Sequence, residues 1–325
     1  MTNVVIIYNE SLLLVKGEPQ DMLAERGVIS CAQAIAAALP RADTIRTVPI
    51  HSDVELALTP YPPAEWVVFN LGEGLEGRLF EEARIAWALE AMGYRFTGSK
   101  GDAVARSIHK ARAKEHLAQA GIPTPPWRVI RDPKEGVGEL SFPVIVKPVA
   151  EDASLGIGLD AVVHDSTALR SRVDHILKCY RQAALAEEFI VGREFNVSVW
   201  GDPPEVLPLA EIDFSSFSDP FERIVSFAAK WQTESFEYNH TPVLCPAPLN
   251  SRQSNRISEL ALAAWETIGC RGYARVDMRM DEQGTPFVIE VNCNPDLSPE
   301  AGFFRAAQAA GYDYAAMVRK IVHLS

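Results

Sequence analysis

The chain has 325 residues, of which 47% are hydrophobic, and its formal net charge is −12. This length suits two or three domains, and the acidic balance argues against a nucleic-acid partner. No apolar run is long enough to span a membrane or to serve as a signal peptide, and the five cysteines lack paired metal-ligand spacing, so we expect a cytoplasmic protein with reduced thiols.

The first hundred residues alternate strand-like and helix-like segments, which predicts a small parallel sheet flanked by helices. Gly72, Gly74 and Gly77 match no dinucleotide-binding fingerprint closely, so we interpret this stretch as a flexible connection. We expect strands at residues 4–8, 46–50 and 66–70, and helices at residues 27–39 and 81–92.

A domain boundary is expected near residues 97–99, and an extended, proline-rich linker at residues 122–126. An apolar strand at residues 142–148 then ends in Lys147. The small-residue loop at 150–158 that follows could present backbone N–H groups to phosphate oxygens. A lysine at a strand end is more often simply solvated, so this motif is weak by itself.

After about residue 100 the predicted strands and helices alternate less regularly, which is typical of an α+β arrangement. We therefore divide the chain into an α/β domain at residues 1–100 and two α+β lobes at residues 101–185 and 186–325. In the lobes we expect helices at 109–120, 166–178 and 251–268 and a closing helix pair, strands at 184–190, 195–200 and 206–214, and an irregular polar segment up to about residue 245.

Oxygen-bearing side chains follow two apolar strands near the C-terminus. Glu290 and Asn292 are two residues apart, so they share one face of their strand, and a turn at residues 281–284 would bring Asp277 to the same face. Donors of this kind suit a hard cation, Mg²⁺ or Mn²⁺. Taken alone, the pattern is more often a solvated hairpin. We interpret Cys293 as a packing residue, because sulfur is a poor ligand for Mg²⁺.

A second group of side chains could hold a purine. Glu187 and Glu188 offer acceptors for an amino group, and Phe189 and Ile190 offer main-chain polar groups and apolar cover. Glu194 could accept hydrogen bonds from ribose hydroxyls. The alternative interpretation of the acids is ordinary surface charge.

Taken in order, these motifs resemble the ATP-grasp ligases, and most closely the D-alanine–D-alanine ligase branch. The resemblance covers nearly the whole chain and implies an ATP-grasp fold preceded by a Rossmann-like N-terminal domain. The residues that carry it are Lys110, 144–148, 187–195, 229–231, 272–277 and 290–292, together with 23–26, 96–99 and 121–125.

The resemblance implies ATP and two Mg²⁺ ions, with Mn²⁺ as the alternative metal. The implied nucleotide-binding residues are Lys110 and Lys147 at the phosphates, Glu187, Glu188 and Phe189 at the adenine edge, Ile190 and Ile289 at its faces, Glu194 at the ribose, and Gly156 in the small-residue loop. Ser154 of the same loop would add a hydroxyl and is expected among the catalytic residues. The implied metal ligands are Asp277, Glu290 and Asn292.

The implied reaction joins a carboxylate to an amine through an acyl phosphate. Arg275 would stabilise the oxyanion, and Lys230 would reach the γ-phosphate from a loop that closes over the site. Glu25 would hold the ammonium group of an amino-acid substrate. The implied partners are small molecules, an amino acid or small peptide plus an amine, and a homodimer is left open.

The sequence departs from the family pattern at the substrate end of the site. Leu71 replaces a histidine, Ala153 a serine and Trp231 a tyrosine, and Ala301-Gly302 stands where the family has Ser-Leu. We therefore expect a ligase with a changed substrate pocket. The alternatives are a true D-alanine–D-alanine ligase and a nucleotide-binding regulatory protein without ligase turnover.

Overall fold

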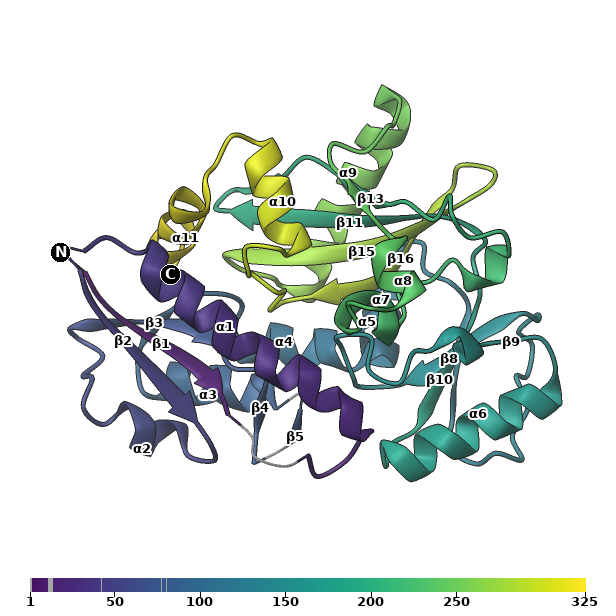
Figure 1. Ribbon diagram of the computed structural model, residues 1–325, viewed down its shortest axis with the longest axis horizontal. Helices are drawn as coiled ribbons and strands as arrows, with labels where there is room; N and C mark the ends of the chain where they lie inside the picture. Colours follow the sequence, from purple (N-terminus) through teal and green to yellow (C-terminus); the bar gives the residue numbers. More distant parts are fainter. Residues whose placement is uncertain (1, 11–13, 42, 77, 80) are drawn as a thin grey trace.

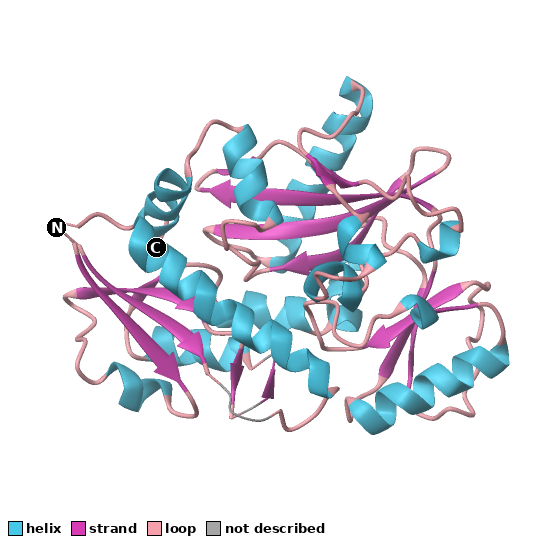
Figure 2. Cartoon of the chain, in the orientation of Figure 1, coloured by secondary structure: helices cyan, strands magenta, loops and turns pink. Residues whose placement is uncertain are grey.

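The computed structural model describes residues 2–10, 14–41, 43–76, 78–79 and 81–325, without the side chains of Glu25 and Leu79. Its helices and strands are arranged around three main β-sheets that follow one another along the chain (Figures 1 and 2). Gly77, one of the glycines in the expected flexible connection, lies outside the described residues. None of the described helices combines the length and the apolar character that a membrane span requires.

The N-terminal sheet is parallel, as predicted, with the strand order β2-β1-β3-β6. The central strand β1 is buried on both faces, so Val4 and Ile6 pack toward α1 while Val5 and Ile7 pack toward α3. Its elements are β1 (Asn3–Asn9), α1 (Met22–Ala38), β2 (Thr44–Ile50), α2 (Val54–Leu58), β3 (Trp66–Leu71), the small hairpin β4 (Gly74–Leu75) and β5 (Arg78–Leu79), α3 (Glu82–Ala91) and β6 (Arg95–Phe96).

Helix α1 begins earlier than predicted. It starts at Met22 instead of residue 27, because the 3₁₀ turn Pro19–Asp21 leads directly into it with reciprocal capping bonds between Glu18 and Asp21. The extra turns carry Ala24 into the core of the central sheet. Helix α1 therefore spans from the N-terminal sheet to the edge of the central one, as Figure 1 shows.

The central sheet is antiparallel, in the order β7-β10-β8-β9. Lys147 pairs with Leu185, and Glu187 lies two residues further along on the same face, so Lys147 and Glu187 are diagonal neighbours. The elements of this region are α4 (Gly101–Ile108), α5 (Lys110–Gln119), β7 (Trp127–Ile130), β8 (Val144–Pro148), a 3₁₀ turn (Leu159–Ala161), β9 (Val162–Val163), α6 (Ser166–Cys179) and β10 (Ala184–Glu188).

The C-terminal sheet has the order β14-β13-β11-β15-β16, with β12 paired to the end of β11. Helix α9 covers one face through an apolar stripe that includes Ile257, Leu260 and Trp265. The elements are β11 (Gly192–Gly201), β12 (Pro204–Val206), β13 (Ala210–Ile212), a 3₁₀ turn (Pro220–Glu222), α7 (Phe227–Trp231), α8 (Phe236–Asn239), β14 (Val243–Leu244), α9 (Ser251–Ile268), β15 (Tyr273–Asp281), β16 (Pro286–Asn292), α10 (Gly302–Ala309) and α11 (Tyr314–His323).

The predicted strand at residues 206–214 is wrong as a single element. It consists of the end of β12 and the short strand β13, which pair with different parts of β11. Pro208 lies between them and has no N–H to donate, so the ladder is interrupted there. The predicted irregular segment also contains the short helices α7 and α8.

Helices α1, α10 and α11 share one hydrophobic core with the N-terminal sheet. Val28 and Ile35 of α1 pack in the same cluster as Phe303 of α10 and Ile321 of α11. This core places one side of α1 beside the loop that follows β16, where the C-terminal sheet ends.

Candidate active site

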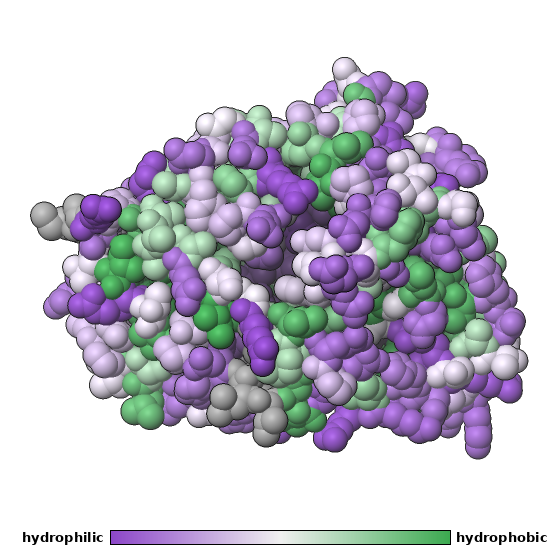
Figure 3. Space-filling model, in the orientation of Figure 1, coloured by the Kyte–Doolittle hydropathy of each residue, from purple (hydrophilic) through white to green (hydrophobic). Residues whose placement is uncertain are grey.

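A cavity of about 980 Å³ lies where the central and C-terminal sheets meet α1, and we call it the cleft. The face shown in Figure 3 is hollowed near its centre. The cleft is lined by these predicted site residues: Lys147, Ser154, Glu187, Glu188, Phe189, Ile190, Glu194, Lys230, Arg275, Asp277, Ile289, Glu290 and Asn292.

Three predicted residues are placed differently. Lys110 is 4% exposed and lies behind the lining, where it contacts Glu290. Gly156 also lies outside the lining, and a Cβ there would come within 2.8 Å of Tyr180 and 2.9 Å of Pro148. Its positive φ of +68° and this close packing explain the glycine without any ligand. The backbone of Glu25 lies in α1, but its side chain is outside the described part of the structure.

The predicted hairpin is present as β15 and β16. Asp277 lies directly opposite Glu290, and Arg275 lies opposite Asn292. The Arg275 guanidinium donates to both oxygens of Asp277, at 2.7 Å and 2.8 Å. The amide of Asn196, which sequence reasoning did not single out, donates to the same carboxylate at 2.7 Å. The acid is therefore held in one orientation at the cleft wall.

A buried lysine compensates the second acid of the hairpin. The Lys110 ammonium donates to Glu290 and, at 2.7 Å, to Asp152, an acid of the small-residue loop that the sequence did not point to. Burial opposes the charge of Lys110, but Asp152 and Glu290 outweigh it and raise the pKa of the lysine. Burial likewise opposes ionisation of Glu290, but Lys110 keeps its pKa well below the usual range. Glu290 is therefore ionised at neutral pH.

The oxygens of Asp277, Glu290 and Asn292 fit a hard divalent cation by their chemistry. Two of the three groups are carboxylates and the third is an amide, so each offers an oxygen donor. Arg275 and Lys110 already neutralise these carboxylates, so an incoming metal ion would compete with both side chains.

A second buried acid lies between two lysines on the floor of the cleft. The Glu187 carboxylate contacts the Lys147 ammonium at 2.6 Å and the Lys114 ammonium at 2.8 Å. Burial would raise the pKa of Glu187, but the two positive charges outweigh burial and lower it to about 2. Burial lowers the pKa of Lys114 to about 8 in spite of Glu187. Lys114 was missed by sequence reasoning because it lies in a helix far from the strand motifs.

The expected purine wall is built around an arginine that was not predicted. The Arg279 guanidinium lies 4.6 Å from the centre of the Phe189 ring and donates to the Ile190 carbonyl at 2.7 Å. It also contacts Glu194 at 2.8 Å, so the acid expected at the ribose already has a partner. The Phe189 N–H donates to the Pro143 carbonyl at 3.1 Å. A bound purine would therefore pair with other main-chain groups of this segment.

Three hydrogen bonds join the small-residue loop to the segment at residues 224–231. The Ser154 hydroxyl donates to the Val225 carbonyl at 2.8 Å, and the Phe227 N–H donates to the Ile157 carbonyl at 2.7 Å. The Trp231 indole N–H donates to the Ala153 carbonyl at 2.9 Å. The two loops are thus connected through main-chain carbonyls, although Ala153 has no side-chain hydroxyl.

Lys230 belongs to this same segment and points into the cleft lining from α7. Burial and the charge of Arg275 lower its pKa, while Asp277 and Glu290 favour its charged form. The cleft therefore gathers positive side chains from β8, α7 and β15 around the carboxylates of the hairpin.

Comparisons with known proteins point in one direction. Residues 117–323 match the family described as D-ala D-ala ligase C-terminus. The chain is 32% identical to the D-alanine–D-alanine ligase of Desulforudis audaxviator over 313 residues, which cover 93% of this chain and 95% of the relative. It is also 33% identical to the uncharacterized protein y4sG of Sinorhizobium fredii over 267 residues, 82% of this chain and 76% of the relative.

Solved structures show the same fold. The structure of D-alanine–D-alanine ligase from Bacillus anthracis complexed with ATP superimposes with a TM-score of 0.76 at 20% sequence identity, covering 100% of this chain and 96% of that one. A second structure of the Bacillus anthracis enzyme gives a TM-score of 0.75 at 21% identity.

Proposed function

Because the chain belongs to the D-alanine–D-alanine ligase family, and so to the ATP-grasp ligases, we propose that it joins a carboxylate to an amine through an acyl phosphate at the cleft. The observation that carries this proposal is the meeting of the β15–β16 oxygen ligands with basic side chains from separate parts of the chain. Lys147 approaches from β8, Lys230 from α7 and Arg275 from β15.

The nucleotide would lie between the central and C-terminal sheets. Lys147 and the backbone of the small-residue loop face the phosphates, and Phe189, Ile190 and Ile289 cover the base. Mg²⁺ held by Asp277, Glu290 and Asn292 would offset the negative charge of the phosphates during transfer. A cytoplasmic location fits this use of ATP and the free thiols of all five cysteines.

Attack of the substrate carboxylate on the γ-phosphate would form the acyl phosphate and release ADP. The amine then attacks the acyl carbon, and the tetrahedral intermediate collapses to an amide and phosphate. Arg275, which lines the cleft, would stabilise the oxyanion of that intermediate. The segment around Lys230 closes over the loop at Ala153 and would exclude water from the acyl phosphate.

The substrate end of the cleft supports a substrate pair other than two D-alanines. Leu71, Ala301 and Gly302 line this end and carry no side-chain donor for a carboxylate. Asp296 and Glu300 line it as well, and their charges would disfavour a carboxylate on the acceptor beside them, while Arg305 of α10 is the positive side chain that lines the cleft nearest to them in the chain. An acceptor that is a larger amine, or one without a free carboxylate at this position, fits these residues better.

We expect D-alanine alone to be a poor substrate, with kcat/KM for D-alanyl-D-alanine formation below about 10⁴ M⁻¹s⁻¹. ADP release is measured for D-alanine and then for a matrix of amino acids and amines. Turnover with another pair supports the proposal. Efficient formation of D-alanyl-D-alanine would show that the chain is a true D-alanine–D-alanine ligase. ATP binding without turnover of any pair would favour a regulatory nucleotide-binding protein.

We expect the segment at residues 232–241 to become protected when the nucleotide binds. Phe236 and Tyr238 are 52% and 38% exposed, so chymotrypsin should cleave beside them in the protein alone. Mg²⁺ with a nonhydrolysable ATP analogue should suppress this cleavage, because phosphates near Lys230 hold the segment closed. Mass spectrometry locates the cleavage site. A Phe236→Ser, Tyr238→Ser double variant should lose this cleavage, which confirms that these two residues are the ones cleaved. Equal cleavage with and without nucleotide would argue against a mobile lid.

A further inference from the structure

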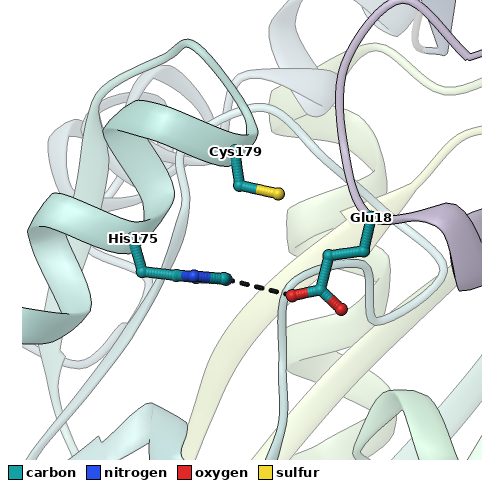
Figure 4. Close-up of side chains that lie close together, drawn as sticks. All are labelled: Glu18, His175 and Cys179. Carbon is teal, nitrogen blue, oxygen red and sulfur yellow. Dashed lines mark ion pairs between the residues drawn. The ribbon is translucent and has the colours of Figure 1, made fainter.

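Three side chains with different donor atoms lie close together at the junction of the N-terminal segment and α6 (Figure 4). Glu18 precedes the 3₁₀ turn before α1, while His175 and Cys179 lie in the last turns of α6. None of the three lines the cleft. The group is therefore separate from the proposed ligase site.

The local fold holds these side chains on facing surfaces. His175 and Cys179 are four residues apart, so they share one face of α6. The Glu18 carboxylate lies 3.1 Å from His175 Nε2, and the carboxylate oxygen, imidazole nitrogen and Cys179 sulfur all lie within 4.8 Å of one another. Each of the three residues is partly exposed, so an ion can reach them from solvent.

The backbone around the group is fixed on both sides. The Gly17 N–H donates to the Cys179 carbonyl at 2.9 Å, which fastens the N-terminal segment to the end of α6. The Tyr180 hydroxyl donates to Asp21 Oδ2 at 3.1 Å, and the Glu18 N–H donates to the same oxygen at 2.8 Å. Asp21 is 1% exposed, and its Oδ1 has no hydrogen-bond partner among the described residues. A buried carboxyl group with one unpartnered oxygen thus lies beside the three donors.

We propose that Glu18, His175 and Cys179 bind a transition-metal ion, with Zn²⁺ as the best match. An oxygen, a nitrogen and a sulfur donor suit Zn²⁺ and not Mg²⁺. Bond lengths of about 2.0–2.3 Å give a tetrahedral ion ligand separations of roughly 3.3–3.7 Å. The Glu18 oxygen and the His175 nitrogen are already about that close. The Cys179 sulfur needs to approach them by about 1 Å at most, which side-chain rotation can supply. As the Zn–S bond forms, the Cys179 S–H bond breaks and its proton passes to water. The hydrogen that His175 Nε2 directs at Glu18 is also given up, so that the imidazole binds through Nε2 as its neutral Nδ1–H tautomer, and a water molecule fills the fourth position.

The ion would act as a clip between two parts of the protein. Glu18 leads into α1, whose residues Ala24 and Gly27 line the cleft, whereas His175 and Cys179 belong to the helix that covers the central sheet. Joining them restrains the first turn of α1 relative to the central sheet. Metal binding is therefore expected to stabilise the folded protein, by an amount that grows with the logarithm of the metal concentration above its dissociation constant.

Co²⁺ titration of the full chain in saturating Mg²⁺ tests this site, because Mg²⁺ blocks the oxygen ligands of the cleft. The wild-type protein and a Cys245→Ser control should bind one Co²⁺ with a near-ultraviolet thiolate-to-cobalt band that Zn²⁺ displaces. Cys179→Ser should lose the band, and His175→Gln should weaken Co²⁺ binding at least about tenfold. No thiolate band in the wild type, or an unchanged band in Cys179→Ser, would overturn the proposal. Circular dichroism confirms that each variant is folded, and none of these readouts depends on ligase activity.

Discussion

Replacing Glu290 with Gln is expected to reduce turnover by at least about 10³-fold, which corresponds to roughly 4 kcal/mol of lost transition-state stabilisation. Glu290 is the ionised acid of the β16 strand, and it faces Asp277 across the hairpin. A neutral amide keeps the shape of the side chain but removes the charge that would hold Mg²⁺ against the phosphates. Steady-state ADP release at rising Mg²⁺ measures the effect.

The fold should survive this change. Lys110 keeps Asp152 as a partner at 2.7 Å when the charge of Glu290 is removed, so no buried lysine is left without an acid. Glu282→Gln is the matched control, because Glu282 is an exposed acid in the turn of the same hairpin. Near-normal turnover of Glu290→Gln at modest Mg²⁺ would refute the assignment of this residue as a metal ligand.

The β15–β16 hairpin could be predicted from the sequence because its signal is local. Alternation places Glu290 and Asn292 on one face of their strand, and the turn after Asp281 joins the two strands. Asp277 faces Glu290 only because the register shifts by one residue between Asp277 and Met278, which the sequence did not indicate. The same rule extends along β15, where Arg275, Asp277 and Arg279 alternate with buried apolar residues. The alternation of side chains along β15 was therefore sufficient to predict that Arg279 shares the face of Asp277, although the sequence analysis stopped at Asp277.

Other residues of the candidate site depend on contacts between distant elements. Lys114 meets Glu187 because α5 packs against the central sheet, and Asn196 meets Asp277 because β11 is the neighbour of β15. Neither pairing follows from spacing along the chain, since each needs the strand order and the packing of a helix. Such residues are found only after the topology is known.

The substrate end shows a further limit of sequence reasoning. Ala153 and Trp231 seemed to remove a side-chain bond between the two loops that close the cleft. The Trp231 indole donates instead to the Ala153 main-chain carbonyl, and a main-chain acceptor leaves no trace in the sequence. A lost side-chain hydroxyl is therefore weaker support for a changed function than a lost charge.

Replacing Glu187 with Gln is expected to lower the free energy of unfolding by about 3–5 kcal/mol and to weaken ATP binding. The change leaves the ammonium groups of Lys114 and Lys147, which are 1% and 5% exposed, facing each other without an anion. Urea unfolding at pH 7 gives the loss of stability, and Glu115→Gln on the same helix as Lys114 is the exposed control. Adding Lys147→Met should restore part of the stability, because one of the two uncompensated charges is then gone.

The same variant should also change how stability depends on acid. The folded-state pKa of Glu187 is about 2, below its ordinary value of 4.5, so its stabilisation is complete above about pH 4.5 and is lost as the pH falls toward 2. Below about pH 4.5 the difference in unfolding free energy between wild type and Glu187→Gln should therefore shrink. Above that pH, Lys114 also contributes to the difference, because its pKa of about 8 falls further when its carboxylate partner is removed. Taking the difference cancels the other carboxylates, which titrate in both proteins. A difference that does not shrink between about pH 4.5 and pH 3 would show that Glu187 is not held as an anion between the two lysines.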